Sequence, residues 1–334
     1  MPGFRKNKSR NLEGEISKLK LNYHKRGFIR LLHTVREIEN TQDFGQFFTG
    51  RRFFYRFFNY QSEYIWDIHP TRALLLNLRS QGIDLFSYVQ RAFVNNNVEY
   101  PFHKNFENIA VMKIDSFENW WTKTIRKKER QSVKKSEKMG VKIEKVNINT
   151  AFLKGVQEIY NETPFREGRR YSGYGLSLAE LEKKFEDIGN SVILGAYVDG
   201  QLIGILWIAF GDRTAMFRSF VSLIGYRDKC PNNALIAEAV RQCEKEGISY
   251  LVYGNHYGFL PSLDLFREHQ GFRKCPLPRY FVPLSRAGQL AIKFGLHRRI
   301  EYSLPRIVER TFLKLYNPLS KITPASVWWR LGGE

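Results

Sequence analysis

Three runs of apolar residues in the second half of the chain carry its clearest secondary-structure signal. They cover residues 192–198, 202–210 and 214–221, and the dipeptides Asp199-Gly200 and Gly211-Asp212 separate them. Apolar runs of strand length between glycine-containing dipeptides are typical of β-strands, and Asp-Gly is a strong hairpin signal. The sequence therefore predicts an antiparallel meander of three strands.

Further elements on both sides extend this meander into a larger sheet. After it we expect a polar loop, a helix, a short buried strand, a second helix and a last strand, over residues 225–232, 233–246, 250–253, 263–269 and 279–282. Before it we expect a helix, a strand and two more helices, over residues 116–140, 141–146, 151–160 and 178–188. A strand–helix–strand unit forms a parallel crossover. The predicted fold class is therefore α+β, with a mixed, mostly antiparallel sheet and helices on both faces.

The first of these helices is unusually basic. Asp115 or Ser116 is placed to cap it, and Gly140 stands where a glycine commonly ends a helix. Between residues 126 and 138 it carries seven basic side chains, opposed by Glu129 and Glu137 alone. Such a face can be merely solvated, or it can bind a polyanion such as tRNA.

The net charge of +20 is concentrated in the flanks of the chain. Residues 1–110 carry +7, residues 111–145 carry +6, residues 146–280 only +1, and residues 281–334 again +6. Such a distribution attracts nucleic acid, anionic membrane or a phosphorylated cofactor. We accordingly expect a basic N-terminal region over 1–110, a catalytic domain over 111–285 and a basic amphipathic helical tail over 286–334.

Composition also excludes several classes of protein. No apolar run is long enough for a transmembrane helix, and the N-terminus lacks the apolar stretch of a signal peptide. The three cysteines, Cys230, Cys243 and Cys275, have no metal-binding spacing. We therefore expect a reduced, cytoplasmic protein with no metal.

The order of elements and several local segments resemble a known superfamily. The meander, polar loop, helix, short strand, helix and strand resemble the GNAT fold of acyl-CoA N-acyltransferases. The resemblance covers about residues 100–285, and within it the branch of CelD-like acetyltransferases and Fem-type peptidyltransferases is the most similar. The segments that carry this second resemblance are residues 110–121, 130–141, 159–170, 233–240 and 278–284. In Fem-type relatives a second, degenerate GNAT half precedes the first, and residues 1–100 are a candidate for one.

The resemblance implies that the loop before helix 233–246 binds the cofactor pyrophosphate. Backbone N–H groups and the positive end of a helix suit phosphate oxygens. The usual small residues of this loop are replaced here by Cys230 and Asn232, and Pro231 has no N–H. That departure puts tight binding of CoA in doubt. The candidate cofactor-binding residues of this loop are Arg227, Lys229, Asn232, Asn233 and Ala234, with Asn232 or Asn233 as the helix cap.

The fold implies direct attack of an acceptor on a thioester or ester. This chemistry needs a base, a hydrogen-bond donor for the oxyanion and an acid for the leaving group. A backbone N–H near Ser222 is the oxyanion donor, and Asn255 is a further cofactor contact. His256 is a candidate base, because histidine titrates near neutral pH. Tyr257 is a candidate acid, although both residues also suit an ordinary loop.

The loop after helix 151–160 is the candidate acceptor site. It holds Arg166, Arg169, Arg170 and Tyr174, and arginines favour an anionic acceptor such as a phosphorylated or carboxylated sugar. Glu162 could hold the acceptor amine or act as a base. The same residues also suit a surface loop with internal ion pairs.

Three functions remain open. The first is transfer of an acyl group from acyl-CoA, most simply acetyl-CoA, to an amine or hydroxyl of a small acceptor. The second is a Fem-type transfer from aminoacyl-tRNA, which helix 126–138 would bind. The third is a non-catalytic GNAT scaffold that binds nucleic acid or membrane. In the tail, apolar residues interleave with basic residues over 287–330, which suits contact with anionic lipid or docking on the domain.

Overall fold

The structure is a computed structural model that describes residues 47–60, 64–67, 69–94, 99–166, 169–186, 188–255 and 261–298. Its helical elements are α2 (Arg72–Ser80), α3 (Phe117–Asn119), the π-helix η1 (Trp120–Thr124), α4 (Lys127–Lys138), α5 (Thr150–Asn161), α6 (Leu178–Phe185), the 3-10 helix η2 (Ile224–Lys229), α7 (Pro231–Lys245), α8 (Pro261–Gln270) and α9 (Arg286–Lys293). Its strands are β1 (Phe47–Arg52), β2 (Tyr55–Tyr60), β3 (Leu85–Val89), β4 (His103–Lys113), β5 (Lys142–Lys145), β6 (Phe165–Arg166), β7 (Arg169–Arg170), β8 (Ser191–Val198), β9 (Gln201–Phe210), β10 (Thr214–Ser222), β11 (Tyr250–Asn255) and β12 (Arg273–Pro283).

One mixed sheet runs through the described part of the chain. Its ten strands have the order β1-β2-β3-β12-β4-β11-β10-β9-β8-β5, and β6 and β7 form a separate hairpin. The pairs β10/β11 and β2/β3 are parallel, and the other pairs are antiparallel. The predicted α+β class with a mixed, mostly antiparallel sheet is thus confirmed. The expected domain boundary at residue 110 falls inside β4, which pairs with β11 and β12 of the predicted 111–285 domain.

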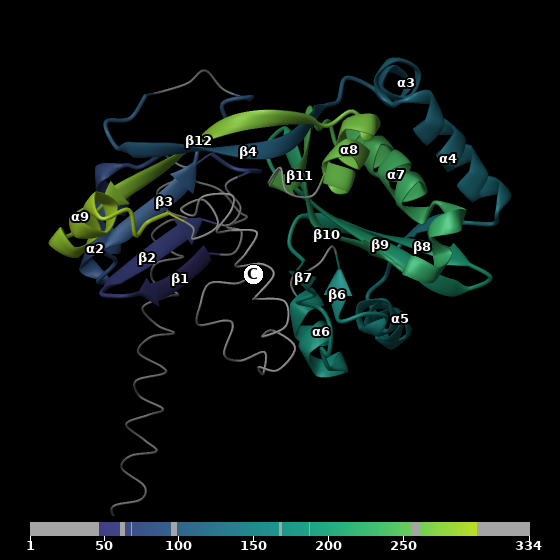
Figure 1. Cartoon of the computed structure of the whole chain (residues 1–334), viewed down its shortest axis with the longest axis horizontal. Helices are drawn as coiled ribbons and strands as arrows, with labels where there is room; N and C mark the ends of the chain where they lie inside the picture. The colour runs from purple at the N-terminus through teal and green to yellow at the C-terminus, as the bar shows by residue number, and fades with distance from the viewer. Residues whose placement is uncertain are drawn as a thin grey trace, which may run out of the picture.

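The predicted meander and crossover are also confirmed. β8, β9 and β10 pair in sequence, and β10, α7 and β11 form the parallel unit. Helices cover both faces of this region: α4, α7 and α8 lie on one face, and α5 and α6 lie on the other (Figure 1). The second end of the sheet holds β1, β2 and β3 with α2 and α9, and the long strands β4 and β12 join the two ends (Figure 1).

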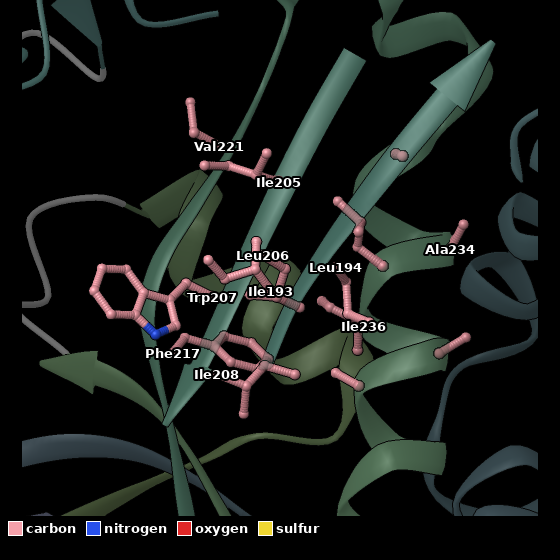
Figure 2. Close-up of a cluster of buried hydrophobic side chains, with 14 of the residues drawn as sticks. Ile193, Leu194, Ile205, Leu206, Trp207, Ile208, Phe217, Val221, Ala234 and Ile236 are labelled. Carbon is pink, nitrogen blue, oxygen red and sulfur yellow. The ribbon is translucent and has the colours of Figure 1, made fainter. Parts of the chain in front are cut away.

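The main core lies between this meander and its helices. Figure 2 shows side chains of β8, β9 and β10 packed with Ala234 and Ile236 of α7. Leu194, Leu206 and Ile236 are completely buried. Because all three strands are buried on both faces, they have the nearly continuous apolar runs seen in the sequence.

The single long helix expected over 116–140 is wrong. Ser116 caps a short helix that becomes the π-helix η1, the chain is extended at Ile125, and α4 then begins at Lys127. The guanidinium of Arg130 holds the break, because it donates to the carbonyl oxygens of Trp121 and Ile125 at 2.8 and 2.9 Å. Those carbonyls have no partner in the ladder of α4.

The β1–β2 hairpin turns on two aromatic residues. Arg52 pairs with Tyr55, so Phe53 and Phe54 are the two residues of the turn. Phe53 has a φ of 52°. This left-handed conformation costs an L-residue with a side chain about 1–2 kcal/mol, and glycine, asparagine or aspartate ordinarily occupies it.

Two predicted regions fall largely outside the described residues. These are the N-terminal part of the basic region, up to residue 46, and the part of the tail from residue 299 onward. Within the described part of the chain, no helix has the length and apolarity needed to cross a membrane.

Candidate functional site

The two central strands separate toward their carboxyl ends. β10 and β11 pair only from Thr214 to Met216, opposite Tyr250 to Val252. Beyond this point, within the described residues, β10 pairs with β9 alone, and a bulge lies between Phe217 and Ser219. Among the described residues, no strand pairs with the β11 side of β10 from Ser219 to Ser222. Alternate backbone N–H groups of β10 there face the gap rather than a sheet partner.

Aromatic side chains line the gap between these strands. Ring centroids of Phe217 and Phe220 lie 5.0 and 5.4 Å from that of Tyr253, and Phe272 lies 5.4 Å from the same ring. A buried cation closes the cluster, because the guanidinium carbon of Arg267 lies 4.7 Å from the Tyr253 ring centroid. Packed aromatic rings therefore fill the space between the separated strands, with one positive charge at its β11 side.

Arg267 is held in place by the end of β11 and by its own helix. It donates to the Asn255 carbonyl oxygen and to the Asp264 carboxylate, both at 3.0 Å. Its Nε is buried and has no hydrogen-bond partner among the described residues. No local sequence signal points to this residue, because its contacts at the gap follow only from the fold.

Glu162 and Arg166 form a clamp on the loop between β10 and α7. The Glu162 carboxylate accepts from the backbone N–H groups of Ile224 and Gly225 at 2.8 and 3.1 Å. Arg166 pairs with Glu162 at 3.1 Å and donates to the Ser222 carbonyl oxygen at 2.9 Å. The structure thus brings together three predicted site residues, but in contacts with one another and with backbone.

The start of α7 offers few free N–H groups. The helix begins at Pro231, which has none, after Cys230 in the left-handed conformation with a φ of 55°. The N–H groups of Asn233 and Ala234 donate to the Cys230 carbonyl oxygen, and Cys230 donates to Arg227. Glu162 also accepts from the N–H groups of Ile224 and Gly225. Most backbone donors of this loop are therefore satisfied within the chain. This loop does not fit the pyrophosphate of CoA in the expected manner.

Asn233 binds inside the protein instead of capping α7. Its side-chain amide donates to the Glu129 carboxylate at 2.6 Å, and both residues are buried. Glu129 is also 3.3 Å from the His269 ring and 3.4 Å from the Gln270 amide. The expectation of an asparagine cap is wrong, since α7 has no side-chain cap.

The remaining predicted residues are dispersed around the gap. Ser222 and Ala234 are buried, Arg227 and Tyr174 are exposed, and Lys229 and Asn232 are half-buried. Asn255 ends β11, and its side-chain oxygen lies 3.0 Å from the Tyr64 hydroxyl. The backbone of Arg169 and Arg170 pairs with β6 in the hairpin beside the clamp. His256 and Tyr257 lie outside the described residues.

A chain of polar groups on the α5 face of β10 was not found from the sequence. The Tyr160 hydroxyl lies 3.3 Å from Ser219 Oγ and 3.4 Å from Lys184 Nζ. The Tyr171 ring meets that of Tyr160 edge to face, and burial raises the pKa of Tyr171 well above its usual range. A hydroxyl, a second hydroxyl and an ammonium group in contact can move a proton between the strand and α6.

Solved structures of other proteins are similar to this chain at low sequence identity. No protein-family model and no curated protein matches the sequence. One similar solved structure is the C-terminal domain of a protein from Agrobacterium fabrum that is described as a lysylphosphatidylglycerol synthetase. Its TM-score is 0.48 at 12% identity, and the match covers 74% of this chain and 83% of that chain. FemX gives a TM-score of 0.44 and 13% identity, with 82% and 79% covered. A GCN5-related N-acetyltransferase from Kribbella flavida gives 0.35 and 9%, with 63% and 72% covered.

Three of the similar solved structures are described as GCN5-related or GNAT proteins. As the sequence resemblance predicted, GNAT proteins and FemX are among the structural neighbours of this chain, at low sequence identity. At these identities the likeness says nothing of substrate, so function must be argued from the gap, the clamp and the charges of this chain.

Proposed function

We propose that this chain is a GNAT-type transferase that moves an aminoacyl group from aminoacyl-tRNA to an amine of a small acceptor. The observation that carries the proposal is the separation of β10 from β11, which leaves backbone N–H groups of β10 beside a cluster of aromatic rings. An ester carbonyl placed at the end of β10 would lie next to these groups. N–H groups aimed at it stabilise the oxyanion that forms when the acceptor attacks.

The reaction is a direct displacement. The acceptor nitrogen forms a bond to the ester carbonyl carbon, the bond from that carbon to the tRNA ribose oxygen breaks, and the proton lost by nitrogen ends on the ribose hydroxyl. The contact between Ser219, Tyr160 and Lys184 is a candidate route for that proton on the α5 face. Arg169 and Arg170 remain candidates for an anionic group of the acceptor.

Two elements favour aminoacyl-tRNA as the donor, namely the loop before α7 and helix α4. Glu162 occupies two N–H groups of the loop, and Pro231 supplies none, so a pyrophosphate has little to bind there. α4 packs on α7, and the Asn233–Glu129 hydrogen bond joins the two helices near their N-termini. The exposed basic residues of this face are Arg126, Lys127, Lys128, Lys134, Lys135 and Lys138. An array of cations on the helix that packs on α7 favours a nucleic-acid donor, since phosphate contacts dominate such binding.

The test compares the two donors on the full chain. We expect aminoacyl-tRNA to bind with an affinity that falls steeply as salt rises, and CoA and acetyl-CoA to show no binding by calorimetry up to millimolar concentration. A Lys127→Ala, Lys134→Ala, Lys138→Ala variant should reduce the slope of log affinity against log salt by up to about three, because each lost phosphate contact removes roughly 0.7–0.9. The matched control is Lys142→Ala, Lys145→Ala on the exposed edge strand β5, which should leave the slope unchanged.

Micromolar binding of CoA that is lost in Arg227→Ala would overturn the aminoacyl-tRNA donor in favour of acyl-CoA. Arg227 is exposed one turn before α7, which is the observation that favours this second candidate. tRNA binding without transfer to any amine would instead support the non-catalytic alternative.

A further inference from the structure

An exposed patch of aromatic and basic side chains lies at the end of the molecule away from α4. It is made by the turn of the β1–β2 hairpin and by the outer side of α9, and we call it the hairpin surface. Its apolar members are Phe53, Phe54, Leu290 and Phe294, with 68%, 47%, 44% and 64% of their area exposed. Its exposed basic members are Arg51, Arg56, Lys293 and Arg298.

Hydrogen bonds fix the two parts of this surface to each other. Arg52 Nη1 donates to the carbonyl oxygens of Leu296 and Arg298 at 3.3 and 3.0 Å, and the Tyr55 hydroxyl donates to Leu296 at 2.9 Å. The hairpin turn is therefore anchored beside the C-terminal end of α9. Leu290 and Phe294 are four residues apart and so share one side of α9 and the turn that follows it.

The hairpin carries two features that oppose its own stability. Phe53 adopts a left-handed backbone conformation in which a bulky side chain is an outlier. Arg51 stands directly opposite Arg56 across the strand pair, and like charges in that position repel. A turn optimised for folding alone would carry glycine or asparagine and opposite charges. Strain of this kind that persists in a structure is a reason to suspect function.

The two segments that form the hairpin surface carry charge of one sign. Residues 47–60 and 284–298 contain no acidic residue. Among the described residues, the Asp84 carboxylate contacts both segments, and it accepts from the Arg56 backbone N–H and from the Ser285 hydroxyl. An occupant of this surface must accept aromatic rings and cations together.

A lipid bilayer with anionic headgroups has this combination of properties. Exposed aromatic side chains enter the boundary between headgroups and acyl chains, and flanking Lys and Arg bind the headgroups. Nucleic acid would use the cations, but it gives aliphatic Leu290 no favourable contact. We propose that the hairpin surface docks this protein on anionic membrane. This inference does not depend on the proposed transfer reaction.

The experiment is sedimentation of the full chain with vesicles. One set is phosphatidylcholine alone, and the other is phosphatidylcholine mixed with phosphatidylserine. We expect binding to the mixed vesicles that weakens with salt, and little binding to phosphatidylcholine. Phe53→Gly, Phe54→Ser should lower the affinity by about tenfold or more, because two aromatic anchors are lost. The same variant should unfold at a higher temperature than the wild type, because glycine relieves the strain at residue 53. Reduced binding therefore cannot be ascribed to misfolding.

Matched controls separate this surface from general hydrophobicity and charge. Leu265→Ser removes an apolar side chain that is 50% exposed on α8, and it should leave vesicle binding unchanged. Lys293→Glu, Arg298→Glu should weaken binding more than Lys135→Glu, Lys138→Glu on α4, which changes the net charge equally. The proposal would be overturned if Phe53→Gly, Phe54→Ser bound the vesicles as tightly as the wild type. It would also be overturned if the two charge-reversal variants lost the same amount of vesicle affinity. Failure of the wild type to bind either vesicle would also overturn it and would leave a protein partner as the occupant to seek.

Discussion

The side-chain amide of Asn233 donates to the buried carboxylate of Glu129 at 2.6 Å, across 104 residues of sequence. It joins the first turn of α7 to the first turn of α4. A buried side chain held in this way faces the protein interior rather than a cofactor phosphate. Asn233 is therefore a structural residue that holds the basic helix against the loop of the candidate site.

Replacing Asn233 tests this role. Asn233→Ala should lower the free energy of unfolding by about 1–3 kcal/mol, because a buried carboxylate loses its shortest hydrogen bond. Chemical denaturation measures the loss. The matched control is Asn232→Ala, whose Oδ1 is buried without a partner in the described structure, so that its removal should cost far less. Equal losses from the two variants would show that the Glu129 contact contributes little.

The clamp formed by Glu162 gives a second prediction. Glu162→Gln keeps the shape of the side chain but loses the ion pair with Arg166 and one of the two backbone contacts. We expect a stability loss of about 1–3 kcal/mol. The amide hydrogens of Ile224 and Gly225 should exchange faster with solvent, which nuclear magnetic resonance can follow. Glu158→Gln, an exposed position on the same helix, should change neither property.

A third prediction concerns Arg267, which lies against Tyr253 and Asn255 of β11. Arg267→Met should destabilise the fold by about 3–5 kcal/mol, because the buried Asp264 carboxylate loses the cation that faces it. Arg267→Met, Asp264→Leu should recover most of that loss, since the pair is then replaced by apolar groups. Thermal and chemical unfolding of the two variants form the measurement. For comparison, Arg241→Met at the exposed pair with Glu238 should cost at most about 1 kcal/mol. A double variant as unstable as the single one would contradict this account.

The pair His103 and His297 predicts a dependence of stability on pH. Their Nε2 atoms lie 3.0 Å apart, and burial lowers the pKa of His297 from 6.5 to about 4. The unfolded chain therefore binds a proton at higher pH than the folded one. The stability contributed by neutral His297 is present above pH 6.5 and is lost as the pH falls toward 4, by about 1–2 kcal/mol after allowance for solvent screening.

Unfolding temperatures measured across that range of pH check this expectation. His297→Gln should flatten the dependence, because glutamine does not titrate. His69→Gln, at an exposed histidine that contacts only the Tyr100 hydroxyl within the described residues, should leave it unchanged. A wild-type stability that is constant across this range would contradict the assignment.

Elements with local signals were predictable from the sequence. Ser177 and Glu180 form the capping box that opens α6, and Asp199-Gly200 makes the tight turn of the meander. The break between η1 and α4 was not predictable, because it depends on where the side chain of Arg130 reaches in three dimensions. β12 proved longer than expected, since Pro276 and Pro278 argue against a strand. Both prolines precede Arg279, where the register with β3 begins, so in the described structure β4 is the strand that pairs with β12 at both prolines, and Gln90 N–H donates to the Pro278 carbonyl oxygen on the other side.

The candidate site was less predictable than the fold. The family resemblance implied a backbone donor near Ser222, and Ser222 ends β10 beyond the point where β10 separates from β11. Residue type alone could not show that Glu162 would bind backbone or that Asn233 would face Glu129, because each partner lies more than 60 residues away. The polar chain through Tyr160 and the position of Arg267 beside Tyr253 were not predictable either, because both depend on how the helices pack on the strands.

The position of β12 also sets the order in which this protein can be completed. β3 and β4 come early in the chain, yet in the described sheet they do not pair with each other, and β12 lies between them. During synthesis the ribosome must release residues 273–283 before either half of the sheet can close on the other. Until then the nascent chain exposes two unsatisfied strand edges, and these are the surfaces that a chaperone would have to cover.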